Sequence, residues 1–200
     1  MSCNLRSSTA ARSLSRPLQA AIIAAVLACT LPGTGHAQNP PPVATAVQQA
    51  LGAPVLSGSG KFTYWGFHVY DAWLWVGARG LDPKILDQPF ALVLRYARDF
   101  SGKDIADRSA EEIAKLGIGS AAQQAAWAAW MQANIPNVKE GDTLTGLYQP
   151  DGGLTLLLNG KRVAANEDPS FARAFFSIWL DERTTGPALR AALLQRARQP

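Results

Sequence analysis

Three polar aromatic side chains alternate along one aromatic stretch of the sequence. Tyr64, His68 and Tyr70 lie at even positions, so they share one face if the stretch is a regular strand. Lys61 begins the stretch, and Arg95 lies near the end of the next strand-like segment. Phenol groups beside a cation can bind a carboxylate or an enolate, so these five residues form the candidate ligand-binding site. An ordinary amphipathic sheet with tyrosines at its rim would give the same pattern, and the sequence leaves both interpretations open.

The side chains that most enzymes use for catalysis are scarce in this sequence. His68 is the only histidine after residue 37, and both cysteines, Cys3 and Cys29, precede that point. A zinc site built from histidine and cysteine is therefore excluded beyond residue 37, and no G-x-S-x-G motif accompanies His68. Glu111 and Glu112 have basic neighbours and are predicted to lie on a solvated helix face. We expect no catalytic residue, no metal and no cofactor.

The first 37 residues have the features of a secretory leader. Three arginines precede an apolar run over 18–31, and Gly35-His36-Ala37 resembles a signal-peptidase site. The apolar run is too short for a membrane anchor, and no later stretch is long and apolar enough to span a bilayer. We expect cleavage after Ala37 and a periplasmic or secreted protein. Lipoprotein processing at Cys29 is the alternative.

The net charge depends largely on that leader. The whole sequence has a formal charge of +4, but the leader holds three basic residues and no acidic ones. The remainder has 16 basic against 15 acidic residues, a formal charge of +1. Nothing in this balance suggests binding to nucleic acid or to anionic lipid.

Local patterns predict strands and helices in separate groups. Residues 38–56 are predicted to be a linker that contains a short helix over 44–51, and Gly58-Ser59-Gly60 is predicted to be a turn. One long strand is expected over 61–76, with a bulge or turn near Tyr70-Asp71-Ala72. The other expected strands span 90–96, 142–148, 154–158 and 162–165, and the expected helices span 102–108, 110–116, 120–134, 168–181 and 188–197.

This order predicts an α+β fold over residues 57–200. Strands and helices come in runs joined by hairpin signals, which favours an antiparallel sheet with helices packed on one face over a β-α-β fold. The helix that begins at Asp168 is predicted to be central because Phe171, Phe175, Phe176 and Trp179 make most of its circumference apolar.

An ordered set of short motifs resembles the bacterial chalcone isomerase-like family. The motifs are Gly58-Ser-Gly60, Gly66-Phe-His-Val-Tyr70-Asp-Ala-Trp-Leu74, Gly141-Asp142, Asn159-Gly160 and Asp168-x-x-Phe171-Ala-x-Ala-Phe-Phe-x-Ile-Trp179-Leu. The resemblance covers about 55–194. It implies an open-faced β-sandwich in which a large antiparallel sheet lies under a layer of helices.

The resemblance also bears on activity. Plant chalcone isomerases use an arginine on an early strand with a Thr, a Tyr and an Asn, whereas related plastid proteins keep an arginine and a tyrosine and bind fatty acids. Here Lys61 is the nearest cation, and Tyr70 corresponds to the threonine or to the fatty-acid binder's tyrosine. Ile105 falls where the enzyme has its tyrosine, and Glu112 falls near its asparagine.

These departures favour binding over catalysis. We expect a non-catalytic exported protein that binds a small apolar or amphipathic ligand such as a fatty acid. The alternatives are an intramolecular lyase or isomerase with a degenerate site, and a structural or assembly protein of the cell envelope. The sequence does not indicate an oligomeric state.

Overall fold

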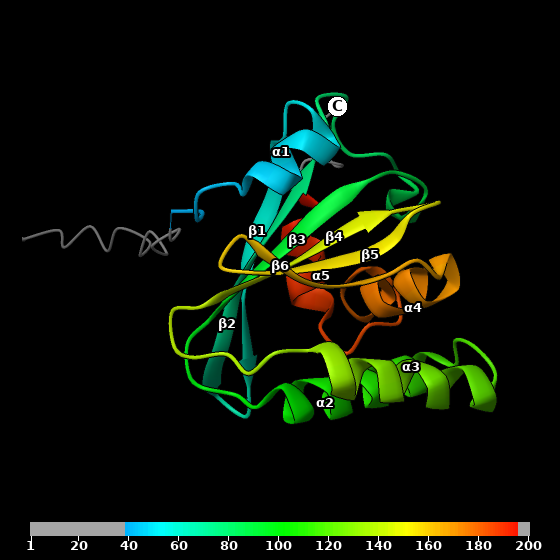
Figure 1. Ribbon diagram of the computed structural model, residues 1–200. Coiled ribbons are helices and arrows are strands. Elements are labelled where there is room, and N and C mark those ends of the chain that lie inside the picture. The colour runs from blue at the N-terminus through cyan, green and yellow to red at the C-terminus, as the bar shows by residue number, and fades with distance from the viewer. Residues whose placement is uncertain (1–38, 196–200) are drawn as a thin grey trace, which may run out of the picture. The chain divides into compact units, whose positions relative to one another are not determined.

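The computed structural model describes residues 39–195, which form six strands, five α-helices and one short 3₁₀ helix (Figure 1). The leader expected over residues 1–37 lies outside the described residues. In chain order the elements are α1 (Thr45–Leu51), β1 (Val55–Tyr64), β2 (Phe67–Val76), η1 (Ile85–Asp87), β3 (Phe90–Tyr96), α2 (Gly102–Leu116), α3 (Ala121–Asn134), β4 (Thr143–Gln149), β5 (Gly153–Leu158), β6 (Lys161–Asn166), α4 (Pro169–Leu180) and α5 (Pro187–Leu193).

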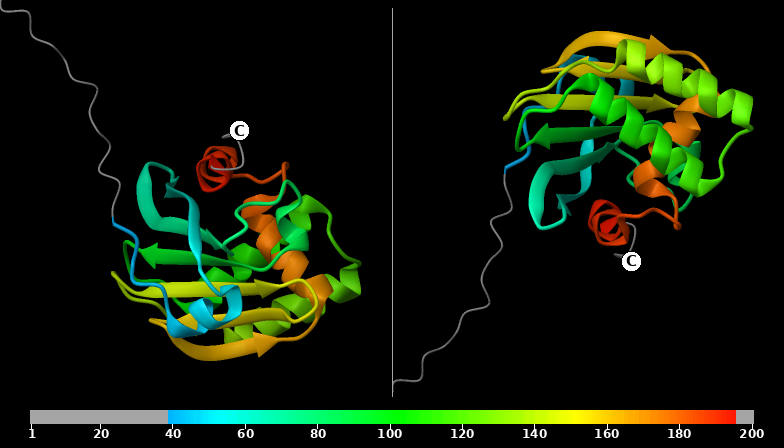
Figure 2. Two further views of the ribbon diagram at one scale, coloured as in Figure 1. Left: turned by 90° about the horizontal axis from the view of Figure 1, so that it is seen from above. Right: turned by 90° about the horizontal axis from the view of Figure 1, so that it is seen from below.

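The six strands form one antiparallel sheet in which each strand pairs with the next one in the chain. Helices α2 to α5 lie on one side of this sheet, here called the inner face, and α1 lies on the other (Figures 1 and 2). The predicted α+β class, an antiparallel sheet under a layer of helices, is therefore confirmed.

The main core fills the space between the inner face and α4. Phe176 packs edge-on against Phe90 and Tyr148 of the sheet, with ring centroids 4.9 and 5.3 Å away. The predicted start of this helix is confirmed, since the Asp168 carboxylate accepts the backbone N–H of Ser170 at 2.8 Å. Removing a buried aromatic ring from such a core typically costs about 3–5 kcal/mol, so α4 holds the layers together.

The predicted turn at Gly58-Ser59-Gly60 is wrong, because these residues lie inside β1. A Cβ atom at Gly58 would collide with the backbone carbonyl of Ala192 in α5. Beside it, the Ser57 hydroxyl donates to the carbonyl of Leu193 at 3.0 Å. The glycine therefore lets a helix end approach the strand closely and does not reverse the chain.

The single long strand predicted over 61–76 is also wrong, because the chain turns back at Trp65-Gly66 between β1 and β2. Both residues have positive φ, 51° for Trp65 and 81° for Gly66, as in the tight two-residue turns of β-hairpins. Tryptophan at such a position gives no sequence signal for a turn, which explains the error.

A β-bulge lies in β2 at Val69, close to the predicted irregularity. Phe62 pairs with Tyr70 while Thr63 pairs with His68, so Val69 is an extra residue. The side-chain alternation therefore shifts by one position there. His68 and Tyr70, predicted to share a face, point to opposite faces of the sheet.

Two other segments differ from expectation. Residues 102–116 form one helix and not two, because the Ser109 hydroxyl donates to the carbonyl of Ile105 at 2.8 Å within the helix and caps nothing. The short helix expected over 44–51 is confirmed as α1, but the expected linker also contains the start of β1. Val47 and Leu51 of α1 pack on the outer face against Leu147 and Leu157, so residues before 57 contribute to the fold.

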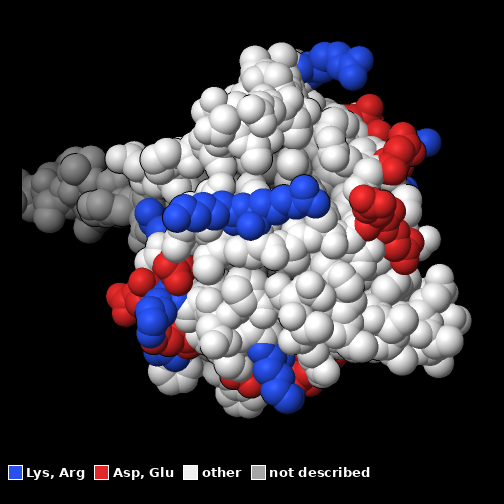
Figure 3. All heavy atoms as spheres, in the orientation of Figure 1, with Lys and Arg blue, Asp and Glu red and all other residues white. Residues whose placement is uncertain are grey.

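The face seen in Figure 3 is mostly uncharged, apart from a row of basic side chains across its middle and acidic and basic side chains towards its edges. Across residues 39–195, none of the helices combines the length and apolarity needed to cross a bilayer.

Candidate functional site

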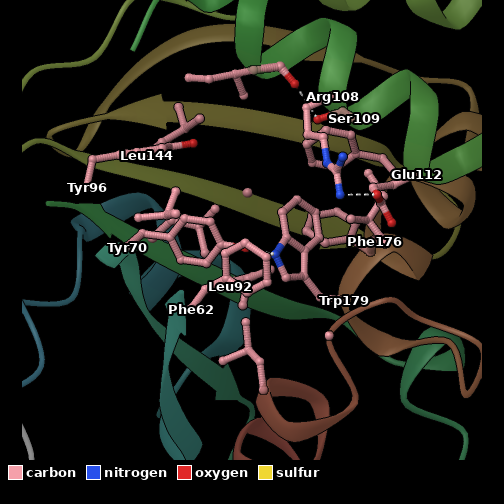
Figure 4. A pocket seen from close by; sticks show the side chains of 18 of the residues that line it. Phe62, Tyr70, Leu92, Tyr96, Arg108, Ser109, Glu112, Leu144, Phe176 and Trp179 are labelled. Carbon is pink, nitrogen blue, oxygen red and sulfur yellow. Dashed lines mark hydrogen bonds and ion pairs between the residues drawn. The ribbon is translucent and has the colours of Figure 1, made fainter. Parts of the chain in front are cut away.

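A cavity of about 270 Å³ lies between the inner face of the sheet and helices α2 and α4 (Figure 4). Aliphatic side chains of the central strands, including Leu92 and Leu144, form its floor. Phe175, Phe176 and Trp179 of α4 close it from the helix side. Its wall is therefore mainly aliphatic and aromatic.

Two tyrosines on neighbouring strands form one polar part of this wall. Tyr70 pairs with Tyr96 across β2 and β3, and their rings meet edge to face with centroids 5.8 Å apart. The Tyr70 hydroxyl accepts the indole N–H of Trp179 at 2.9 Å, and Phe62 stacks on its ring at 5.0 Å. Burial raises the pKa of both tyrosines well above the ordinary value. Both phenols are therefore neutral hydrogen-bond donors at physiological pH.

An ion pair on α2 forms a second polar part, seen on the right of Figure 4. Arg108 Nη2 lies 2.6 Å from Glu112 Oε1, one helical turn away. Glu112 also accepts from Lys115 at 2.9 Å and from the Thr185 hydroxyl at 2.6 Å. Burial alone would raise the pKa of Glu112, but these hydrogen bonds and the charges of Arg108 and Lys115 outweigh burial and lower it. Glu112 is therefore an ionised carboxylate on the pocket wall.

The predicted site residues separate into two groups. Tyr64 and Tyr70 line the cavity, as expected for a shared site. Lys61, His68 and Arg95 do not line it, and they gather around Asp71 on the outer face. His68 Nε2 lies 3.1 Å from Asp71 Oδ1, Arg95 Nη2 lies 3.7 Å from Asp71 Oδ2, and Lys61 pairs with Asp71 in the strand register.

The bulge at Val69 and the register around Asp71 explain this separation. In a regular pleat His68 would point the same way as Tyr70, but the extra residue places His68 beside Asp71 instead. Lys61 and Arg95 lie directly opposite Asp71 in β1 and β3, so they share its face.

Sequence reasoning from residue patterns missed the α2 part of the site. Glu112, predicted to lie on a solvated face, has 5% of its surface exposed. The usable signal was the spacing of Ile105, Arg108 and Glu112, which places them on one side of a helix. The family resemblance did point to Ile105 and Glu112, and both line the cavity.

The chemistry available in the cavity favours binding over proton transfer. An efficient general acid or base has a pKa near the working pH. Burial raises the pKa values of Tyr70 and Tyr96, and the partners of Glu112 lower its pKa, so all three values move further from neutral pH. No cluster of His, Cys, Asp and Glu suited to a metal occurs within residues 39–195.

Comparison with known proteins assigns this architecture. A family model for chalcone isomerase-like proteins matches residues 42–195. The chain belongs to the chalcone isomerase-like family. Among solved structures, this chalcone isomerase-like protein is similar to a fatty-acid binding protein of Arabidopsis thaliana, with a TM-score of 0.53 and 13% sequence identity. The similarity covers 72% of this chain and 88% of that chain, and at this identity it shows a shared fold. Curated protein sequences give no match.

Proposed function

We propose that this chalcone isomerase-like protein binds a small apolar or amphipathic ligand, such as a fatty acid, without transforming it. The observation that carries the proposal is the cavity of about 270 Å³ with its aliphatic and aromatic wall. Its size is close to the lower end of the range for small-molecule sites, about 300–1,000 Å³. The fatty-acid binding protein with the same fold supports this ligand class.

The proposed binding site is the cavity and not the outer-face cluster. Tyr64 and Tyr70 remain in it, and Arg108 replaces Lys61 as the cation on the wall. Lys61, His68 and Arg95 surround Asp71 and are proposed to stabilise the sheet.

We also propose that the protein acts after export, in the periplasm or outside the cell. The support is the leader pattern in residues 1–37 of the sequence. The mass of the protein recovered from a periplasmic fraction tests this. A chain that begins at Gln38 is expected, whereas a lipid-modified chain that begins at Cys29 would establish lipoprotein processing.

Native mass spectrometry of the exported protein, followed by solvent extraction, tests the binding proposal. An adduct that is released on denaturation is expected and would identify the ligand class. Titration with candidate ligands then measures affinity, with tryptophan fluorescence as the readout, to which Trp179 in the cavity wall contributes. Tyr70→Phe should weaken binding, and Lys61→Ala should not, since Lys61 lies on the outer face.

Two results would overturn the proposal. The first is an apo protein that binds none of a series of acyl-chain and aromatic ligands. The second is turnover of a chalcone above its spontaneous rate, which would establish the isomerase alternative.

A further inference from the structure

Few charged side chains face the cavity, and the cation among them is already paired. Among the described residues, Arg108 is the cation on the cavity wall, and Asp104 and Glu112 are the anions. A carboxylate ligand would therefore have one cation to bind and two like charges to avoid.

The guanidinium of Arg108 already has partners. Its Nη2 lies 2.6 Å from Glu112, its Nη1 lies 3.4 Å from Glu111, and its Cζ lies 5.0 Å from the ring centroid of Tyr64. Glu112 is itself fixed by Lys115 and by the Thr185 hydroxyl. Displacing Glu112 from Arg108 would leave a buried carboxylate with less compensation, which is costly.

A ligand carboxylate therefore has no favourable place in this cavity. Transfer of an ionised carboxylate into apolar surroundings is strongly unfavourable unless a cation and hydrogen-bond donors compensate for the lost water. If the ligand bound at Arg108, its carboxylate would lie beside Glu112, and the second cation that pairs with Glu112, Lys115, does not line the cavity. Like charges a few ångströms apart in a partly buried site repel each other strongly.

The donors that remain are uncharged. The Tyr70 hydroxyl accepts from Trp179, so its own proton is available to a ligand. The Tyr96 hydroxyl has no hydrogen-bond partner among the described residues, although its ring is buried against the cavity. Two neutral phenols suit a neutral acceptor such as a hydroxyl, ester or amide oxygen.

We infer that the pocket selects amphipathic ligands with an uncharged polar group, such as an alcohol or an ester, over carboxylates with the same apolar chain. Tyr70 and Tyr96 hold the polar group, and Glu112 excludes the acid by occupying Arg108. This inference rests on the proposed ligand-binding function and narrows its ligand class from fatty acids in general to their uncharged derivatives, such as alcohols and esters.

Decanol and decanoate form a matched pair of probes, since they differ in the polar end alone. At pH 7 the alcohol is neutral and the acid is ionised. We expect decanol to bind at least about tenfold more tightly than decanoate, as measured by titration of the folded protein with Trp fluorescence as the readout.

The variant Glu112→Gln separates the role of charge from that of shape. The amide keeps the size of the side chain and removes the anion beside Arg108, so affinity for decanoate should rise about tenfold while affinity for decanol stays within about twofold. Glu111→Gln is the control, because it removes an anion from the same arginine on a side chain that is 61% exposed and does not line the cavity. It should leave the ratio of the two affinities near that of the unmodified protein.

The outcomes are distinguishable. Decanoate binding as tightly as decanol, or an unchanged ratio in Glu112→Gln, would overturn this selectivity and leave the ligand-binding function standing. Failure of both probes to bind the folded protein would overturn this inference, and failure of the whole acyl-chain and aromatic series as well would overturn the ligand-binding function.

Discussion

The hydroxyl oxygen of Tyr70 lies 2.9 Å from the indole nitrogen of Trp179 and accepts its N–H. This hydrogen bond joins β2 to α4 across the cavity, so the same two side chains shape the pocket and connect the sheet to the helix layer. Its contribution to stability can be separated from its contribution to binding.

Tyr70→Phe should lower the free energy of unfolding by about 1–2 kcal/mol, because the Trp179 N–H loses its acceptor in a part-buried position. Tyr96→Phe is the matched control, since its hydroxyl has no partner among the described residues. Its effect should stay within about 0.5 kcal/mol. Urea denaturation measures both, and equal losses in the two variants would contradict the role given to the hydrogen bond.

Gly58→Ala should be destabilising by about 1–3 kcal/mol, because the new methyl group would collide with the Ala192 carbonyl and push α5 away from β1. Gly77→Ala provides the comparison. Its Cβ would lie 3.4 Å from the Leu51 carbonyl, a contact that a small shift relieves, so the loss should be smaller. Thermal unfolding of the two variants checks this, and a melting temperature that Gly58→Ala leaves unchanged would show that α5 does not depend on the close approach.

Trp65→Asn should stabilise the protein by about 0.5–1 kcal/mol, since asparagine tolerates a positive φ better than tryptophan does. The sequence itself contains the preferred version of this turn. Asn159 and Gly160 have φ of 50° and 80°, against 51° and 81° for Trp65 and Gly66. Trp65 is 83% exposed, so little packing is lost with it.

Val163→Asn controls for the loss of an exposed apolar side chain, because Val163 is 44% exposed and lies within strand β6. No gain is expected there. A loss of stability in Trp65→Asn would show that the indole makes contacts that outweigh its backbone strain.

Glu112 should make the free energy of unfolding depend on pH in the acidic range. Its pKa is lowered in the folded protein, so its ionised form stabilises the fold above the unfolded pKa of about 4.3. That contribution is lost as the pH falls below about 4 towards the folded value. Between pH 7 and pH 3, the free energy of unfolding should therefore fall more steeply in the unmodified protein than in Glu112→Gln.

The comparison isolates Glu112 because both proteins keep Asp142, Asp168 and Asp181, whose pKa values are also lowered. Urea denaturation at each pH provides the measurement. Parallel curves for the two proteins would contradict the assignment of Glu112 as an ionised, stabilising group.

Much of the secondary structure could be predicted because its signals are local. Ser120 forms the capping box with Gln123 that begins α3, and Asp168 with Pro169 begins α4 where expected. The strands expected over 90–96 and 154–158 lie within one residue of β3 and β5. Each of these signals acts within a few residues of the chain.

The errors came from contacts that no local pattern contains. A glycine inside a strand often marks a place where another part of the backbone approaches closely, as at Gly58. The helix that approaches Gly58 is more than 130 residues away in the sequence, so no local pattern indicates it. One extra residue at Val69 reverses the direction of His68, which therefore does not share the face of Tyr64 and Tyr70. A pocket and a core also have the same composition, so Arg108 and Glu112 could not be placed on a cavity wall from residue patterns alone.

The strand order has a consequence for how this scaffold can change. Since every strand pairs with its neighbour in the chain, α2 and α3 form one excursion between β3 and β4, two strands that already pair with each other. The charged pair Arg108 and Glu112 lies on this excursion, whereas the phenols lie on the sheet. Mutation or recombination within the excursion can therefore alter the electrostatic half of the pocket without changing the register of any strand. Evolution can therefore change the ligand preference of this fold while the sheet stays the same.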